Sequence, residues 1–140
     1  MTWQTTASAT TTAGSEQIWA LWSNVSSWNR WDHEVVSSTL NGAFALGTTG
    51  TLKPRGGPAT RFVITDIRPV VSFSDRSRLP LATLDFHHTL SVTDGITTIE
   101  HSVVMNGPLT PVFRRVIGTK IAKGLPTAVA ALAALAEGVT

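Results

Sequence analysis

The sequence predicts an α+β fold, a curved antiparallel sheet of about six to seven strands covered on its concave face by a long C-terminal helix. Three observations lead to this prediction. Alternating apolar and polar segments follow one another through the middle of the chain, the turn dipeptide Asp94-Gly95 joins the two longest of them, and apolar residues recur at helical spacing from Thr110 to Glu137. No linker or repeat divides the chain, so we expect one domain over residues 1–140.

Composition limits the classes of function. Hydrophobic residues make up 42% of the chain and charged residues 14%, which leaves much apolar surface to bury around a core or a cavity. The net charge is only +2 and no basic run is interleaved with aromatic residues, so we expect no nucleic-acid partner. The absence of cysteine excludes disulfides and cysteine-ligated zinc. Because there is neither a secretory signal nor an apolar run of the ~18 residues that span a membrane, we expect a cytoplasmic protein without integral membrane contact.

A strand and two short helices are predicted at the start of the chain. The threonine-rich stretch Trp3–Thr10 is typical of a strand. Residues 15–24 predict a helix, with Glu16 in the first turn, where the helix dipole favours an acid. The apolar residues of this helix recur at helical spacing: Ile18, Leu21 and Trp22.

The segment 25–35 predicts the second short helix. On it Trp28 and Trp31 are three residues apart and therefore share one face. These two tryptophans either pack into the core or form the wall of a cavity. Trp3 and Trp22, if exposed, would mark the contact face of a homodimer.

Four strands are predicted between these helices and the Asp94-Gly95 hairpin. They cover Val35–Leu40, Thr49–Pro54, Thr60–Arg68 and Val71–Leu79. Turn residues such as Asn41-Gly42 and Pro69 separate them. The glycine-rich segment Pro54–Pro58 is a loop and not a phosphate-binding loop, because no Gly-Lys-Ser/Thr sequence follows and no helix starts there.

Asp94-Gly95 sets the register of the strands on either side of it. A type I′ turn needs positive φ at both central residues, and it would pair Thr93 with Ile96. Because side chains alternate along a strand, one face then carries His88 directly opposite His101, with Cβ atoms roughly 5 Å apart. The other pairs on this apolar face are Val92 with Thr97, Leu90 with Ile99, Phe86 with Val103, and Leu84 with Met105.

The inward histidine pair has three interpretations. Both rings can be hydrogen-bonded core residues, or they can line a cavity and hydrogen-bond or polarise a ligand. They can also belong to a metal site, but two histidines without cysteine or an HExxH pattern are too few. We therefore expect no metal and no cofactor.

An inward acid is predicted beside the histidine pair. If residues 79–82 form a tight turn, Phe73 lies opposite His88 and Asp75 is its diagonal neighbour. Asp75 would then orient the His88 ring and raise its pKa. The alternative is a bulge that turns Asp75 outward.

The last helix is predicted from about Thr110 to Glu137, with a kink at Pro126, which lacks the N–H that an unbroken helix needs. Such a helix over an apolar sheet can act as a lid, or it can simply curve around the core. Its first half is basic and forms either a solvated face or a docking patch: Arg114, Arg115, Lys120 and Lys123.

The chain as a whole resembles a known family. The segments that carry the resemblance are "SEQIWALWSNVSSWNRWDHEV", "LNGAFALGTTGTL", "TRFVITDIRP", "LDFHHTLSVTDGITTIEHSVVMNGPL" and "GLPTAVAALAALAE". They resemble the polyketide cyclase/dehydratase branch of the START-like (SRPBCC) superfamily, which includes the birch pollen allergen fold. The resemblance implies a helix-grip fold, a single START-like ligand-binding domain over residues 1–140, and a deep hydrophobic cavity under the C-terminal helix. Relatives bind lipids, hormones or polyketides, and some cyclise or dehydrate polyketides.

The leading functional hypothesis is binding of a small hydrophobic molecule, such as a lipid or a polyketide, in a cavity between the sheet and the C-terminal helix. The expected ligand-binding residues come from the second short helix, the inward face of the sheet and the C-terminal helix. They are Trp28, Trp31, Phe73, Phe86, His88, Leu90, Ile99, His101, Val103, Met105, Phe113 and Ile117.

Two alternatives remain open. A cyclase or dehydratase would use His88 and His101 as acid and base, with Asp75 as a third candidate catalytic residue. Aromatase/cyclase relatives commonly combine an arginine with tyrosine or other polar groups in the pocket, whereas this chain has no tyrosine, and Arg76 and Arg78 alternate away from the inward face. A protein-interaction module without a ligand is the second alternative, and the basic start of the last helix is its only indication.

Overall fold

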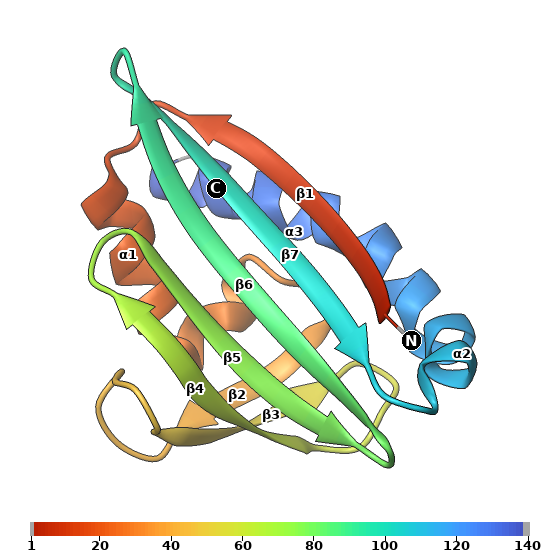
Figure 1. The fold of residues 1–140 in the computed structure, drawn as a ribbon. Coiled ribbons are helices and arrows are strands. Elements are labelled where there is room, and N and C mark those ends of the chain that lie inside the picture. Colours follow the sequence, from red (N-terminus) through yellow and green to blue (C-terminus); the bar gives the residue numbers. More distant parts are fainter. Residues whose placement is uncertain (1, 139–140) are drawn as a thin grey trace.

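The computed structural model describes residues 2–138, and Figure 1 shows a curled antiparallel sheet that wraps around a long C-terminal helix. The seven strands lie in the order β1-β7-β6-β5-β4-β3-β2. Their bounds are β1 Thr2–Thr11, β2 Val35–Leu40, β3 Thr49–Pro54, β4 Thr60–Arg68, β5 Ser72–Leu79, β6 Ala82–Thr93 and β7 Ile96–Asn106. The predicted helix-grip architecture is confirmed. Strands β2 to β7 follow one another as hairpins, and β7 returns beside β1.

The register predicted around Asp94-Gly95 is confirmed at every pair. Both turn residues have positive φ, 52° and 76°, as a type I′ turn requires. Thr93 pairs with Ile96, and His88 consequently lies opposite His101. On the next strand, β5 pairs with β6 so that Phe73 lies opposite His88, again as predicted.

The chain between β1 and β2 crosses from one edge of the sheet to the other and carries tryptophans into the core. Helix α1, Ser15–Ser23, is followed by the predicted second short helix, which is a 3₁₀-helix, Val25–Arg30, and Trp31 comes directly after it. Trp28 and Trp31 are nevertheless both buried. Trp22 is completely buried, so the expectation that it could mark a homodimer face is wrong.

The C-terminal helix is irregular near its start and continuous across Pro126. It consists of α2, Thr110–Phe113, a π-helical turn, Arg114–Gly118, and α3, Thr119–Ala136. The sequence predicted an irregularity at Pro126. The structure instead has a π turn that ends at Gly118, the glycine that touches the first strand. A Cβ at Gly118 would lie 3.2 Å from the Trp3 indole. The ring of Trp3 therefore fixes where the helix meets the sheet edge.

The concave face of the sheet holds two separate apolar clusters. The aromatic cluster lies under α1, the 3₁₀-helix and the second half of α3. Its buried members are Ile18, Trp22, Val25, Trp28, Trp31, Phe62, Ile64, Phe73, Leu90, Ile99, Ala128, Val129, Leu132 and Ala133. The distal cluster lies under α2, the π turn and the start of α3, and its members are the buried Leu84, Val103 and Met105 with the partly buried Trp3, Leu79, Phe86, Phe113, Ile117, Ile121 and Leu125.

One helical stretch of the described residues, Thr110–Ala136, is long and apolar enough by length and composition to cross a membrane, with a mean hydropathy of 1.2. This differs from the expectation of no such segment. The core helix of a soluble protein can pass the same test, and α3 here packs against β1 and β7.

Gly50 in β3 provides a stability test of this packing. A methyl group at this position would collide with the ring of Phe62 and lie 2.5 Å from the carbonyl oxygen of Thr39. The Phe62 ring also stacks on Trp28 with the ring centroids 5.6 Å apart, so it cannot move freely. Gly50→Ala should lower the free energy of unfolding by about 1–3 kcal/mol in urea at pH 7. Gly14→Ala, whose added carbon has no neighbour closer than 3.8 Å, is the control; because Gly14 is the N-cap of α1, this change should cost no more than about 1 kcal/mol. Equal stability of the two variants would contradict this packing.

Candidate ligand-binding site

The histidine pair lies where the two apolar clusters meet. Along β6, His88 stands between Phe86 of the distal cluster and Leu90 of the aromatic cluster. On β7, His101 stands between the same two clusters, and the two imidazole centroids are 4.7 Å apart. The rings cross edge to face at 76°, and the His88 ring also stacks on Phe73 at 3.9 Å.

Each imidazole is held by one hydrogen bond that fixes its tautomer. The indole N–H of Trp22 donates to Nε2 of His101 at 3.2 Å. Because an indole nitrogen only donates, the proton of His101 is on Nδ1. Nδ1 of His88 lies 3.2 Å from the carbonyl oxygen of Phe73, which only accepts, so Nδ1 of His88 carries the proton. Neither Nε2 of His88 nor Nδ1 of His101 has a hydrogen-bond partner within residues 2–138.

Burial keeps both imidazoles uncharged. It lowers the pKa of His88 well below the usual value, and the neighbouring His101 lowers it further. Burial also lowers the pKa of His101 to about 3. Near neutral pH neither ring carries the proton that a general acid would deliver, and both are weak bases. The pair therefore favours hydrogen bonding over proton transfer.

Asp75 faces the concave side, but it does not orient His88. It lies opposite Phe86 on β6, so the predicted diagonal placement is confirmed and no bulge turns it outward. The Phe73 carbonyl holds the His88 ring instead, and the predicted rise in the pKa of His88 is wrong, because burial lowers it. The Asp75 side chain is only 5% exposed and forms no hydrogen bond within residues 2–138. Burial, with a smaller contribution from Asp85, raises the pKa of Asp75 to about 8.

The predicted ligand-binding residues divide between the two clusters. Trp28, Trp31, Phe73, Leu90 and Ile99 belong to the aromatic cluster and are buried core residues. In the distal cluster, Val103 and Met105 are buried, whereas Phe86, Phe113 and Ile117 are partly exposed. The predicted residues thus fall into two apolar clusters on either side of the histidines.

Several neighbours of the histidine pair were missed at the sequence level. Trp22 was placed on a helix and considered for a homodimer face, yet its N–H fixes the tautomer of His101. Its helical spacing from Ile18 gave no sign of a polar role. Trp31 lies 5.6 Å from His101 between ring centroids, and its indole N–H is buried without a partner within residues 2–138. The missed members of the distal cluster are Trp3, Leu79, Leu84, Ile121 and Leu125.

Arginine does not reach the concave face from β5. Arg76 points to the other side and binds Asp85 through both guanidinium contacts, at 2.6 and 3.1 Å. Within residues 2–138, no three His, Cys, Asp or Glu side chains gather as metal ligands would. The metal interpretation of the histidine pair therefore has no third ligand there.

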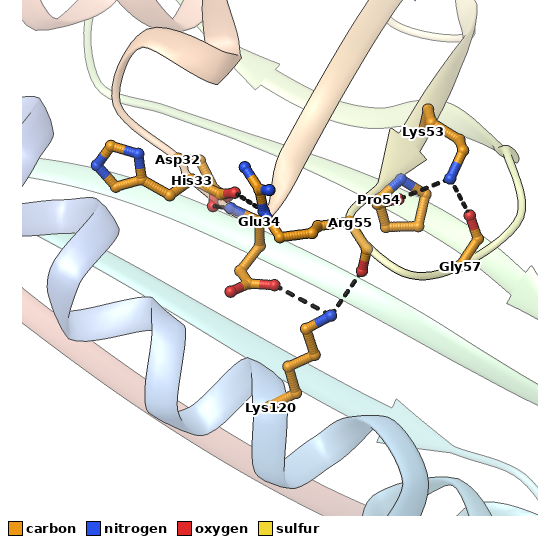
Figure 2. A network of polar contacts seen from close by, with 8 residues as sticks. All are labelled: Asp32, His33, Glu34, Lys53, Pro54, Arg55, Gly57 and Lys120. Atoms are coloured by element: carbon orange, nitrogen blue, oxygen red, sulfur yellow. Dashed lines mark hydrogen bonds and ion pairs between the residues drawn. The ribbon is translucent and has the colours of Figure 1, made fainter.

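A polar network ties two loops to the C-terminal helix (Figure 2). The ammonium of Lys120 donates to the carbonyl oxygen of Arg55 at 2.6 Å and lies 3.2 Å from a carboxylate oxygen of Glu34. Arg55 in turn donates from Nε to the carbonyl oxygen of His33 at 2.9 Å. Lys120 is therefore engaged, and the basic start of the helix is not a continuous unpaired patch. Arg114 and Arg115 are exposed and form no salt bridge within the described residues.

Two hollows in residues 2–138 lie away from the histidines. One, of about 260 Å³, lies beside the Lys120 network between the start of β2 and α3. The other, of about 310 Å³, lies at the β5–β6 turn and extends to Gly107. Neither is lined by His88, His101 or Asp75.

Comparison with protein families identifies the group. The family described as "Polyketide cyclase / dehydrase and lipid transport" matches residues 2–137. The chain belongs to this family. The two activities in the description of the family, polyketide cyclisation or dehydration and lipid transport, both concern small hydrophobic molecules. No curated protein matches the sequence.

Several solved structures have the same fold as this chain. The Zhui aromatase/cyclase from a Streptomyces species has a TM-score of 0.79 at 11% identity, with 98% of this chain and 94% of that chain covered. A START superfamily protein from Mycobacterium smegmatis has a TM-score of 0.72 at 12% identity, with 98% and 99% covered. Norcoclaurine synthase from Thalictrum flavum has a TM-score of 0.73 at 12% identity, with 96% and 86% covered. At these identities the likeness establishes the fold alone.

The tautomers of the two histidines can be measured directly. Long-range ¹H–¹⁵N NMR spectra should show both rings protonated on Nδ1, with no titration between pH 8 and pH 5, because burial excludes the charged form. Free imidazole in the sample provides the titration reference. In Trp22→Phe the indole donor is gone, and His101 should lose its bias toward the Nδ1–H tautomer. A midpoint near pH 6 for either ring in the wild type would contradict the assignment.

The raised pKa of Asp75 predicts how stability depends on pH. Between about pH 4 and pH 8 the folded protein keeps the Asp75 proton that the unfolded chain releases, so this carboxyl lowers stability as the pH rises. Urea unfolding should show Asp75→Asn gaining stability over the wild type by up to about 1.4 kcal/mol per pH unit in this window. Asp66→Asn, at an exposed position of β4, is the control. Parallel pH profiles for wild type and Asp75→Asn would show that Asp75 is ionised in the folded state.

Proposed function

We propose that the protein binds a small hydrophobic molecule, such as a lipid or a polyketide-like ring compound, at the distal cluster, next to the histidine pair. One observation carries the proposal. Seven of the ten apolar side chains of the distal cluster are only partly buried, whereas fourteen of the twenty-five in the aromatic cluster on the same face are buried. A ligand that covers Phe86, Phe113 and Ile117 would gain about 25 cal/mol per Å² of apolar surface removed from water, before ordering costs.

The helix above the distal cluster is built to open. Strand β1 anchors the long segment α3, while α2 is a single turn and the following π turn interrupts the regular hydrogen-bond ladder. A ligand would enter by displacing the segment Thr110–Gly118, and the buried Thr110 and Gly118 at its two ends would then leave the sheet.

The histidines suit a role in orienting a ligand. Their uncharged rings leave Nε2 of His88 as an acceptor and Nδ1 of His101 as a donor, on strand positions next to the distal cluster. Efficient acid–base catalysis favours groups with pKa values near the working pH. The lowered pKa values of both rings support binding by hydrogen bonds over catalysis by these two side chains.

Two tryptophan substitutions on neighbouring helix positions test the proposed site. Ile117 contributes to the distal cluster, whereas Val116 points outward and is 67% exposed. Ile117→Trp should fill the site and weaken binding of the neutral fluorescent probe N-phenyl-1-naphthylamine by about tenfold or more, a change of ~1.4 kcal/mol. Val116→Trp should leave its affinity within about twofold.

Probe fluorescence, with circular dichroism of both variants as a folding control, provides the measurement. Failure of the wild type to bind the probe would reject a hydrophobic site. Binding that is unchanged in Ile117→Trp would reject its location at the distal cluster.

A further inference from the structure

An unpartnered acid stands on the concave face without a cation. Asp75 is buried on β5, directly opposite Phe86 of the distal cluster and diagonal to His88. Its carboxyl group forms no hydrogen bond within residues 2–138. A buried carboxyl without a partner is costly to keep in a protein, so it calls for an explanation such as a bound water or ion or a functional role.

No charged group of the described chain lies on the concave side to balance an ionised Asp75. Asp85 is on the other face of β6 and is neutralised by Arg76. On α3, Lys120 binds Glu34 and the Arg55 carbonyl at the polar network. The remaining charged groups of the neighbouring elements are exposed: Arg61, Asp66 and Arg68 on β4, Arg78 on β5, Glu100 on β7, Arg114, Arg115 and Lys123 on the C-terminal helix. Among the titratable side chains of β5, β6 and β7, only the uncharged His88 and His101 share the concave face with Asp75.

The result is a strip of neutral hydrogen-bonding groups beside an apolar site. Because its pKa is raised to about 8, Asp75 keeps its proton near neutral pH and can donate it in a hydrogen bond. His88 contributes a free acceptor and His101 a free donor, as their fixed tautomers require. An anionic ligand would meet no cation here, and its own charge would be buried at high cost.

We propose that Asp75, His88 and His101 select a neutral ligand with a carbonyl or hydroxyl oxygen, Asp75 donating the hydrogen bond to that oxygen. The proposal rests on the hydrophobic site inferred above and adds the chemical class of its ligand. The polar end of the molecule lies at the histidines and its apolar body lies among Phe86, Phe113 and Ile117. Carboxylates of the same size and shape are excluded.

A matched series on one two-ring scaffold tests this selection. The probes are 2-acetylnaphthalene, naphthalene, 2-naphthoate and 2-naphthylmethylammonium, titrated calorimetrically at pH 6.5 and pH 9.5. At pH 6.5 the ketone should bind about tenfold more tightly than naphthalene, as one well-made hydrogen bond to a buried donor predicts, and 2-naphthoate at least about a hundredfold more weakly than the ketone. At pH 9.5, where Asp75 has lost its proton, the advantage of the ketone over naphthalene should disappear.

Two substitutions of Asp75 separate the effect of its hydrogen bond on binding from any effect on folding. Asp75→Asn keeps a donor that does not titrate, so the ketone should retain its advantage over naphthalene at both pH values. Asp75→Leu removes the donor, so the ketone and naphthalene should bind equally at both. Thermal unfolding shows that each variant is folded.

The possible failures are distinguishable. If naphthalene and the ketone bind alike to the wild type and to Asp75→Leu, the selection by Asp75 is wrong while the hydrophobic site stands. Tightest binding of the ammonium probe would make Asp75 an ionised counter-ion and overturn the proposal. If no probe binds, the hydrophobic site itself is wrong.

Discussion

The structure depends on keeping two facing imidazoles uncharged inside an apolar sheet. Cross-strand pairing across Asp94-Gly95 leaves His88 and His101 no place but the concave face, where ionisation would be strongly penalised. One donor and one acceptor from the aromatic cluster, the Trp22 indole and the Phe73 carbonyl, satisfy one nitrogen of each ring. The other two nitrogens remain free. The pair is thus half satisfied by the fold, which is what a ligand-orienting position requires.

The histidine pair separates two apolar clusters that differ in how completely their side chains are buried. The aromatic cluster packs three buried tryptophans under the end of the sheet nearest α1, and α3 completes it with small and branched residues. The distal cluster has three buried residues and a larger number of partly exposed ones, under a helix whose regular hydrogen bonding is interrupted by a π turn. In the proposed function, the aromatic cluster holds the polar groups in place while the distal cluster admits an apolar molecule. The description of the family joins polyketide chemistry and lipid transport.

The sequence was sufficient for the parts of the fold that local rules determine. Asp94-Gly95 demands a particular turn, and alternation then places every inward side chain of β6 and β7, including both histidines. Long-range packing could not be predicted in this way. Nothing local to Trp22 indicates that its N–H reaches His101, seventy-nine positions away. The π turn itself was likewise not predicted, although Gly118, where it ends against Trp3, is one of the glycines that weaken the middle of the helix. The pKa of His88 was predicted in the wrong direction because Asp75 was assumed to be ionised, whereas burial acts on both groups.

Amide hydrogen exchange over Thr110–Gly118, with and without 2-acetylnaphthalene, tests the central claim most directly. The account predicts that these amides exchange at least about tenfold faster than those of residues 126–136 in the free protein, because opening this segment leaves α3 on the sheet. Bound ketone should slow their exchange together with that of Leu84–His88 on β6. Exchange at Thr110–Gly118 that is as slow as in the rest of α3, and unchanged when the ketone binds, would contradict a site at the distal cluster reached through this helix.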